Sequence, residues 1–327
     1  MDLLTQPLPV ELTGHDLLRP SDLVPAESEA VLALAARLKT RPRHEPLLPG
    51  RTLGLLFFKP STRTRVSFAA GMTQLGGAAI PLHPEELQLS RGESLADTAR
   101  VLSGYLDAIA IRTYAHRDVE EWAEAASIPV LNALTDEQHP CQALADALTI
   151  RERVGGTEGV RIAWVGDGTN VLVSLAELGS QLGITIVAAC PPGYEPSDDA
   201  SLRSFELVRD PREAVAGADV VVTDTWTSMG HKGERERRLR DLESYRLDAA
   251  LLELAHPEAI VLHCLPAHPG EEITAEVLYG PRSAVWQEAE NRLHVHKALL
   301  ALLLGETTSA RSSASSTASP RRAARRT

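Results

Sequence analysis

The chain has 327 residues, which is enough for two domains at roughly 150 residues each and for a core that needs no disulfides or metal ions. Hydrophobic residues make up 43% and charged residues 24%, so collagen-like and wholly disordered chains are excluded. The formal net charge of −11 disfavours a surface built for the phosphate backbone of nucleic acid. Any phosphate site must therefore be local.

Cysteine usage and hydropathy predict a cytoplasmic protein. Cys141, Cys190 and Cys264 stand far apart without a CxxC pair, which argues against a disulfide framework or zinc cluster and favours a reducing compartment. No apolar run approaches the roughly 18 residues of a membrane span. The first residues lack the charged start and long apolar core of a signal peptide. We therefore expect no membrane association and no metal ion.

Strand-like and helix-like patterns alternate from residue 52 onward, which predicts βαβ units and a parallel sheet. In the first part of the chain the predicted strands are Thr52–Phe58, Ala78–Leu82, Ala108–Arg112 and Pro129–Ala133. Helical spacing occurs between them at Arg65–Leu75, Asp97–Gly104 and Val119–Ala126. A further helix, Cys141–Val154, is expected to lead out of this first unit.

The pattern begins again after Gly155-Gly156, which predicts a second α/β unit with helices between its strands. Its predicted strands are Val160–Val165, Ile184–Ala189, Asp219–Thr223 and Ala259–His263, and a closing helix is expected at Glu288–Leu304.

Together these patterns predict an α/β fold of two doubly wound parallel-sheet domains joined by interdomain helices. We expect the first domain at residues 1–150 and the second at 151–287, with the closing helix 288–304 packing back on the first. Residues 306–327 hold five arginines among serine, threonine and alanine. Such a segment buries too little apolar surface to order itself, so we predict a disordered basic tail.

The segment STRTR at residues 61–65 follows the first predicted strand and opens a helix. Ser61, Thr62 and Thr64 would bring hydroxyls and backbone N–H groups to the helix N-terminus, where the dipole favours an anion. Arg63 and Arg65 add forked donors that suit phosphate. A capped helix with solvated arginines is the ordinary alternative, but so many polar residues in succession favour an anion site.

A second polar cluster, residues 135–142 (TDEQHPCQ), follows the last strand of the first unit. His139 and Gln142 are three residues apart, so both side chains can face one ligand above the carboxyl edge of the sheet. A neutral imidazole polarises a carbonyl group and an amide holds an NH₂ group. A purely structural His-Pro pair is the alternative.

Two further clusters follow strands of the second unit, at residues 224–230 (DTWTSMG) and 263–266 (HCLP). The carboxylate of Asp224 and the thiol of Cys264 would suit a cationic amine, although a buried cysteine is most often a small apolar residue. The segment GDGTN at residues 166–170 lacks the GxGxxG fingerprint, and no ribose-binding acid ends the next strand.

Five segments together resemble the aspartate/ornithine carbamoyltransferase family: STRTR at 61–65, HPCQ at 139–142, DTWTSMG at 224–230, HCLP at 263–266 and AENR at 289–292. They occur in the family's order, between about residues 10 and 304. The resemblance implies a first domain for carbamoyl phosphate, a second for the amino acid, a homotrimer or multiple of trimers, and no cofactor. It further implies transfer of a carbamoyl group to the side-chain amine of L-ornithine, giving citrulline and phosphate in arginine metabolism.

The resemblance also implies site residues by position. Carbamoyl phosphate would contact Ser61, Thr62, Arg63, Thr64, Gln88, Arg112, His139, Gln142, Cys264, Leu265 and Arg292, with Gln88 serving the site of a neighbouring subunit. Ornithine would contact Asn170, Asp224, Ser228 and Met229. The implied catalytic residues are Arg63, His139, Asp224 and Cys264.

Other functions stay open on the sequence. Aspartate as the amine acceptor would require cationic residues where this chain has DTWTSMG and HCLP, whereas putrescine shares the terminal amine of ornithine. A nicotinamide-dependent oxidoreductase is suggested only by the fold pattern and GDGTN. A non-catalytic binding protein would not need arginine, histidine and cysteine gathered at strand ends.

Overall fold

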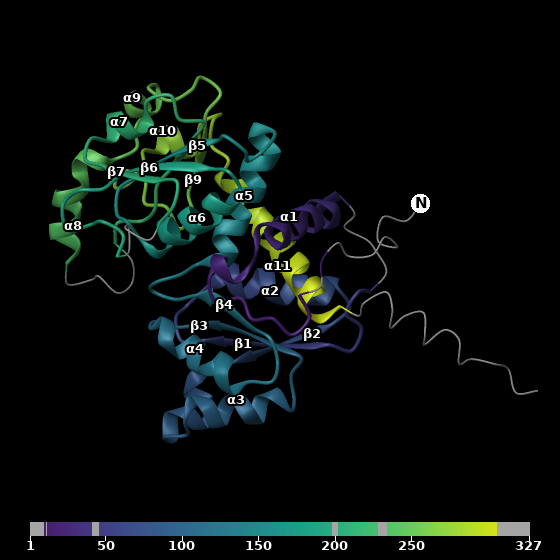
Figure 1. Cartoon of the computed structure of the whole chain (residues 1–327). Coiled ribbons are helices and arrows are strands. Elements are labelled where there is room, and N and C mark those ends of the chain that lie inside the picture. Colours follow the sequence, from purple (N-terminus) through teal and green to yellow (C-terminus); the bar gives the residue numbers. More distant parts are fainter. Residues whose placement is uncertain (1–9, 11, 41–45, 198–201, 228–233, 306–327) are drawn as a thin grey trace, which may run out of the picture.

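The computed structural model describes residues 10, 12–40, 46–197, 202–227 and 234–305. The predicted tail at 306–327, together with Ser228 and Met229, lies outside these residues. Two α/β halves lie side by side, with α1, α5 and α11 running between them (Figure 1). The fold class predicted from the sequence is confirmed: two parallel sheets, one of four and one of five strands.

The first sheet has the strand order β2-β1-β3-β4, with every pair parallel. Its strands are β1 (Thr52–Phe57), β2 (Ala78–Leu82), β3 (Ala108–Arg112) and β4 (Val130–Leu134). Both faces are covered. Leu53 and Leu55 of β1 pack into a core shared with α1, α2, α5 and α11, whereas Leu56 points to the opposite core under α3 and α4. The crossover from β2 past β1 to β3 is what makes this sheet doubly wound.

The second sheet has the order β7-β6-β5-β8-β9 and is also parallel throughout. Its strands are β5 (Arg161–Val165), β6 (Thr185–Ala189), β7 (Phe205–Val208), β8 (Val220–Val222) and β9 (Ile260–Leu262). Side chains on its inner face, such as Trp164, belong to the same core as the first sheet. Val165 and its outer neighbours pack under α7 to α10.

The helices alternate with these strands. They are α1 (Pro25–Thr40), α2 (Thr62–Gln74), α3 (Leu95–Ser103), α4 (His116–Ala125), α5 (Pro140–Val154), α6 (Asn170–Gln181), α7 (Pro211–Val215), α8 (Arg235–Leu242), α9 (Ala249–Leu252), α10 (Ala275–Leu278) and α11 (Val285–Leu304). The short 3₁₀ helices are η1 (Pro20–Asp22), η2 (Pro84–Glu86), η3 (Gln88–Arg91) and η5 (Glu243–Tyr245).

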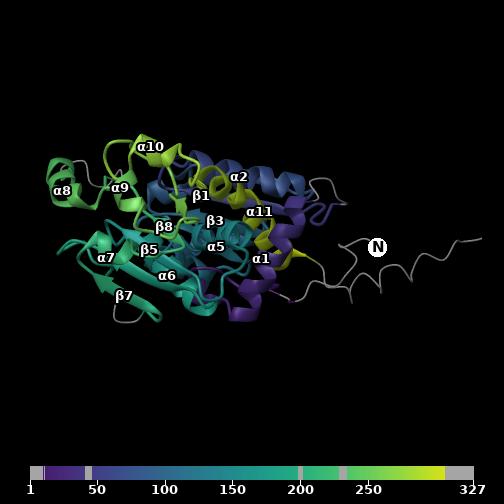
Figure 2. The ribbon, with the colours of Figure 1, turned by 90° about the horizontal axis from the view of Figure 1, so that it is seen from above.

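The closing helix α11 packs along α1, α2 and α5 (Figure 2). Its 20 residues are buried for most of their length, including His296 and Lys297, because neighbouring helices surround it. One continuous apolar core therefore runs from the first sheet through α1, α5 and α11 to the second sheet. This shared core fixes the position of the carboxyl edge of one sheet relative to the carboxyl edge of the other.

Two elements were absent from the sequence-based expectations. α1 has ordinary helix signals, Pro25 in its first turn and Lys39 in its last, but it lies before the first predicted strand. β7 is a short edge strand whose residues are only partly buried, so it lacks the apolar run by which the other strands were predicted. The predicted boundaries of the remaining strands differ from the observed ones by one residue or none.

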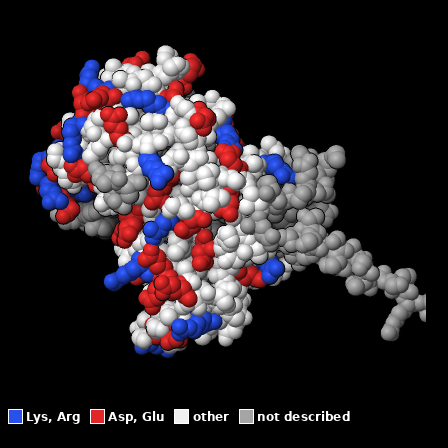
Figure 3. All heavy atoms as spheres, in the orientation of Figure 1, with Lys and Arg blue, Asp and Glu red and all other residues white. Residues whose placement is uncertain are grey.

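Acidic and basic side chains intermingle over both halves on the face shown in Figure 3. This agrees with a local rather than a surface-wide site for phosphate.

Over the described residues, no helix combines the length and the apolar composition needed to cross a bilayer. Cys141 and Cys190 are buried, Cys264 is half-buried, and all three are free thiols.

Candidate functional site

The turn between β1 and α2 brings a helix N-terminus to the predicted anion site. Ser61 is the N-cap residue, in extended conformation, and α2 starts at Thr62. The Ser61 side chain makes no capping hydrogen bond within the described chain, so it does not occupy the amides of the first turn. These amides carry the positive end of the helix dipole, which favours a negatively charged ligand. The STRTR segment is therefore positioned as the sequence predicted.

Three arginines gather around this turn. Arg112, at the end of β3, has its Nη1 atom 3.5 Å from Ser61 Oγ. Burial, then the charge of Arg292 and, less strongly, that of Arg63 lower the pKa of Arg112 to about 10. Burial is also the first cause that lowers the pKa of Arg292, with the charge of Arg63 acting in the same direction. An anion bound among the three guanidinium groups would offset their mutual repulsion.

Arg63 reaches from the first half of the molecule to the second. Its Nη2 atom donates a hydrogen bond of 2.6 Å to the backbone oxygen of Leu265, in the loop after β9. Leu265 has φ of 58°, a left-handed conformation that costs a branched residue energy and is typical of functional loops. The turn at Leu265 thereby directs its carbonyl group toward the anion-binding arginines.

His139 and Gln142 lie at the start of α5, against α11. The Oε1 atom of Gln142 accepts a hydrogen bond of 2.5 Å from Arg292 Nη1, and Arg292 Nη2 donates to Thr64 Oγ1 at 2.9 Å. The backbone N–H of His139 donates to Ser174 Oγ at 2.7 Å. Burial, followed by the positive charge of Arg292, holds the pKa of His139 well below its usual value. Its imidazole is therefore neutral near pH 7.

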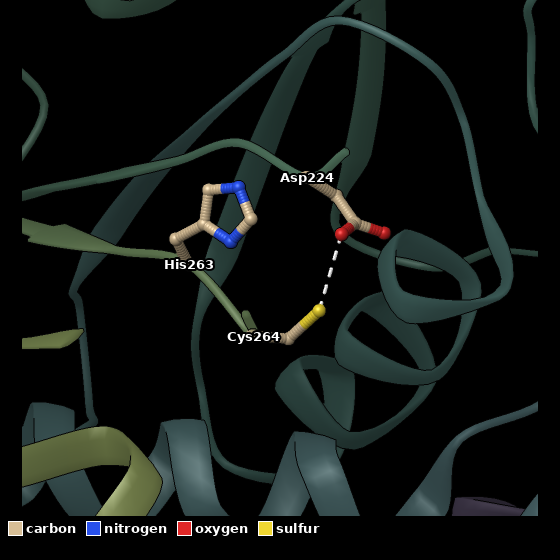
Figure 4. Close-up of side chains that lie close together, drawn as sticks. All are labelled: Asp224, His263 and Cys264. Carbon is tan, nitrogen blue, oxygen red and sulfur yellow. Dashed lines mark hydrogen bonds between the residues drawn. The ribbon is translucent and has the colours of Figure 1, made fainter. Parts of the chain in front are cut away.

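Asp224 and Cys264 face each other at two neighbouring strand ends (Figure 4). Cys264 Sγ donates to Asp224 Oδ1 at 3.1 Å, and Thr169 Oγ1 donates to Asp224 Oδ2 at 3.0 Å. Burial and then the charge of Asp224 raise the pKa of Cys264 well above its usual value. The thiol therefore stays protonated. A carboxylate with a neutral thiol beside it can orient an amine as the amine loses a proton.

Asp224, His263 and Cys264 are the type of residues that hold metal ions, and one possible ligand atom from each lies within 4.8 Å of the others. Hydrogen bonds already occupy His263. Its Nδ1 atom accepts from the backbone N–H of Leu265 at 3.0 Å, and its Nε2 atom lies 3.2 Å from Glu272 Oε1. Both ring nitrogens of His263 are therefore hydrogen-bonded within the chain, and Asp224, His263 and Cys264 are not arranged to bind a metal ion together.

His268, Glu271 and Glu272 form a second group of this type. Glu271 pairs with Arg235 of α8, and Glu272 with His263. These carboxylates are therefore also committed to partners within the chain.

Asn170, predicted to contact the amino acid, is the first residue of α6. Its Nδ2 atom donates to the backbone oxygen of Thr135 at 2.5 Å, which ties α6 to the turn between β4 and α5. Gln88 lies apart on η3 with an exposed side chain, and among the described residues this side chain accepts a hydrogen bond only from Arg91. The structure thus brings together most of the predicted residues, but not Gln88.

A cavity of about 530 Å³ opens beside the turn between β1 and α2, residues 58–62, which we name the phosphate turn after the predicted ligand. It is lined by Phe57, Phe58, Lys59, Pro60, Ser61, Thr62, Arg65, Val66, His83 and Glu85. Ser61 and Thr62 in this lining belong to the predicted anion site, and His83 and Glu85 come from the segment after β2.

Three residues of the site were missed from the sequence: Thr169, Asp146 and Glu288. Thr169 bonds to Asp224, while Gln142 Nε2 donates to Asp146 Oδ1 at 2.7 Å and to Glu288 Oε1 at 2.8 Å. Asp146 follows Gln142 by four residues on one helix, a spacing that was available as a signal. Glu288 comes from a distant helix, so no local pattern marks it.

The fold and the site define a class of protein: two parallel α/β domains that place an arginine-rich anion site opposite a carboxylate–thiol pair. Comparison with known families identifies the family within this class. Residues 15–152 match the model described as aspartate/ornithine carbamoyltransferase, carbamoyl-P binding domain. Residues 158–303 match the model for the Asp/Orn binding domain of the same enzymes. The chain belongs to the aspartate/ornithine carbamoyltransferase family.

Individual relatives agree with this. An ornithine carbamoyltransferase of Gloeobacter violaceus is 52% identical over 300 residues, covering 89% of this chain and 96% of the relative. One from Bacillus subtilis is 52% identical over 303 residues, covering 90% and 95%. The solved structure of ornithine carbamoyltransferase from Pyrococcus furiosus has a TM-score of 0.86 and 47% identity, covering 90% of this chain and 98% of that one.

Proposed function

We propose that this protein transfers the carbamoyl group of carbamoyl phosphate to the side-chain amine of L-ornithine, giving L-citrulline and phosphate. The observation that carries the proposal is the hydrogen bond from Arg63 to the Leu265 carbonyl group. It places the anion-binding turn of the first half against the loop of Asp224 and Cys264 in the second. The family to which the chain belongs and its relatives support the same two substrates.

In the proposed site, phosphate binds the first-turn amides of α2 with Arg63 and Arg112. The carbamoyl group lies beside His139, Gln142 and Arg292. Donors of His139 and Arg292 stabilise the negative charge that develops on its carbonyl oxygen, and the side-chain oxygen of Gln142 faces its NH₂ group. Carbamoyl phosphate is already activated as an acyl phosphate, so catalysis consists mainly of positioning and charge stabilisation.

The amine of ornithine would lie between Asp224 and the carbamoyl carbon. Its nitrogen forms a bond to that carbon, the bond from the carbon to the phosphate oxygen breaks, and phosphate leaves with the electron pair. Asp224 and the thiol of Cys264 orient the amine, and the proton that the amine gives up passes to the departing phosphate. We assign Asn170, Ser228 and Met229 to the rest of the amino acid, by their place in the family motifs.

Purified protein is expected to form citrulline and phosphate from ornithine and carbamoyl phosphate without added metal or nucleotide, since side chains and amides supply the required charges. Citrulline is measured colorimetrically, and putrescine and aspartate are tested in parallel as acceptors. No product with ornithine, together with turnover of putrescine or aspartate, would reject ornithine as the substrate.

We also propose that the active site is completed by a second copy of the chain within a homotrimer. Gln88 is exposed, and a cavity lies next to the phosphate turn. Val66 at that cavity is 59% exposed and Ile80 of β2 is 45% exposed, which suits burial against another subunit. A cyclic trimer has heterologous interfaces, so each boundary can join Gln88 of one chain to the arginines of the next.

Mixing an inactive Gln88→Ala chain with an inactive Arg63→Ala chain is therefore expected to restore part of the activity. Each mixed trimer contains one boundary that draws an intact Arg63 from one chain and an intact Gln88 from the other. Activity is measured after refolding the chains together, with each variant refolded alone as the control. If mixtures shown by mass to contain hybrid trimers stay as inactive as their parents, Gln88 does not serve a neighbouring site.

For the compartment we propose the cytoplasm. Cys141, Cys190 and Cys264 are all free thiols, and Cys264 must stay reduced to keep its hydrogen bond to Asp224.

A further inference from the structure

We propose that Asp146 and Glu288 are positioning residues, which hold the amide of Gln142 with its oxygen toward the carbamoyl group and thereby set the preference for an NH₂ group. This inference rests on the proposed function. It concerns two buried acids that make no contact with the phosphate turn in the described structure and that the reaction as described above does not use.

The three side chains meet between two helices. Gln142 and Asp146 lie one turn apart on α5, and Glu288 lies in the first turn of α11. Gln142 Nε2 donates both of its hydrogens, to Asp146 Oδ1 at 2.7 Å and to Glu288 Oε1 at 2.8 Å. Each of the three residues is at most 1% exposed. Water therefore does not compete for these hydrogen bonds, and their geometry is well determined.

Charge fixes which way the amide points. The two carboxyl groups accept hydrogen bonds on one side, and on the other side Arg292 Nη1 donates to Gln142 Oε1 at 2.5 Å. A rotated amide would place its NH₂ group against the guanidinium group and its oxygen against the carboxyl oxygens, and so lose all three bonds. A carbonyl oxygen has two lone pairs, and Arg292 uses one of them. The second can accept a hydrogen bond only from a donor such as the carbamoyl NH₂ group.

The two acids share a proton. Burial, followed by the charge of Asp146, raises the pKa of Glu288 well above its usual value, and burial raises the pKa of Asp146 to about 7. The proton that the pair keeps above about pH 7 therefore lies on Glu288 and bonds to Asp146, so that the pair then carries one negative charge opposite Arg292. This arrangement lets two carboxyl groups bind a single amide without repelling each other.

Glu288 also joins this pair to the other half of the site. Its Oε2 atom accepts a hydrogen bond of 2.8 Å from the backbone N–H of His263, the residue before Cys264. One carboxyl group thus connects Gln142 to the loop that carries Cys264 and the Leu265 carbonyl group. The Glu288 side chain thus fixes the position of the carbamoyl-binding amide of Gln142 relative to the amine-binding loop.

The test compares carbamoyl phosphate with acetyl phosphate, which carries a methyl group in place of NH₂ and keeps the same phosphate. The parent enzyme is expected to bind carbamoyl phosphate more tightly than acetyl phosphate. Both Glu288→Leu and Asp146→Ala are expected to reduce that preference at least about tenfold, since a misoriented amide no longer accepts from the NH₂ group. Acetyl phosphate itself should bind within about threefold of the parent, because the phosphate turn is intact. The readouts are KM for carbamoyl phosphate and Ki for acetyl phosphate.

Two variants serve as controls. Glu288→Gln is expected to keep a preference between those of the parent and Glu288→Leu, since its single oxygen can accept from Gln142 or from the backbone N–H of His263 but not from both. Glu290→Gln, two residues along the same helix and exposed, should behave as the parent. A merely structural role predicts instead that the affinities for both phosphates fall together.

The inference is overturned if Glu288→Leu or Asp146→Ala, folded as judged by its melting temperature, keeps the parent's preference, or if both phosphates lose affinity equally. If one variant does not fold, the other decides. Failure of the proposed function is a separate result, because the parent enzyme itself would then form no citrulline.

Discussion

Replacing Arg63 with alanine is expected to lower kcat/KM for carbamoyl phosphate by about 30- to 1000-fold, which corresponds to roughly 2–4 kcal/mol of transition-state stabilisation. Arg63 lies in the first turn of α2 and is exposed at the site, so its loss leaves the core unchanged. It removes a forked donor from the departing phosphate and also the hydrogen bond to the Leu265 carbonyl group. Activity should therefore collapse while the fold survives.

The measurement is steady-state kinetics with carbamoyl phosphate as the varied substrate, beside a thermal melt of each variant. The kcat/KM of Arg63→Lys should lie between those of the parent and Arg63→Ala, since lysine keeps the positive charge but cannot donate two parallel hydrogen bonds. Arg100→Ala is the matched control, because Arg100 is an exposed arginine paired only with Asp97 on α3 in the described structure. A kcat/KM for Arg63→Ala within about threefold of the parent would place Arg63 outside the site.

Changing Asp224 to asparagine is expected to lower kcat/KM for ornithine by about 30-fold or more, and to leave the affinity for carbamoyl phosphate within about threefold. The substitution keeps the shape of the side chain and removes the charge that faces the amine. Asparagine also presents one NH₂ group where the carboxylate accepts hydrogen bonds from both Cys264 Sγ and Thr169 Oγ1. The amine loses its orienting charge, and the partner that fixes the thiol is weakened.

Ornithine and carbamoyl phosphate are varied separately, so that the two halves of the site are distinguished. The matched control is Asp210→Asn, which changes an exposed N-cap residue of α7 to an equally good cap. Equal losses for both substrates would indicate a general disturbance of the second half rather than a role of Asp224 toward the amine. An unchanged KM and kcat for ornithine would remove Asp224 from the site.

Segments that combine a strand, a turn and a helix N-terminus are readable from the sequence. The STRTR segment follows the apolar run of β1, and its hydroxyls and arginines are enough to indicate an anion site at that turn. His139 and Gln142 are similar, because Pro140 begins α5 and the three-residue spacing places both on the first turn. The roles carried over from the family motifs remain predictions. Among the described residues the Gln88 side chain bonds only to Arg91, and Ser228 and Met229 lie outside the described residues.

Contacts between distant segments could not be predicted from the sequence. The hydrogen bond from Arg63 to Leu265 joins residues 202 positions apart, and that from Gln142 to Glu288 joins residues 146 apart. Glu288 does not differ locally from an ordinary helix-surface acid, and Asp146 is marked only by its four-residue spacing from Gln142. Both are buried because α5 and α11 pack against each other, and that contact depends on the core shared by the two sheets.

The sequence by itself therefore determined the fold class, the positions along the chain of all described strands except β7, and the chemical character of each motif. These properties follow from hydrophobic period and from residue types within a few positions of one another. Only the tertiary structure decided which motifs meet, how the Gln142 amide is oriented, and that the Cys264 thiol is held protonated by burial and by Asp224. Those properties depend on distance, burial and charge between segments far apart in the chain, and no local pattern encodes them.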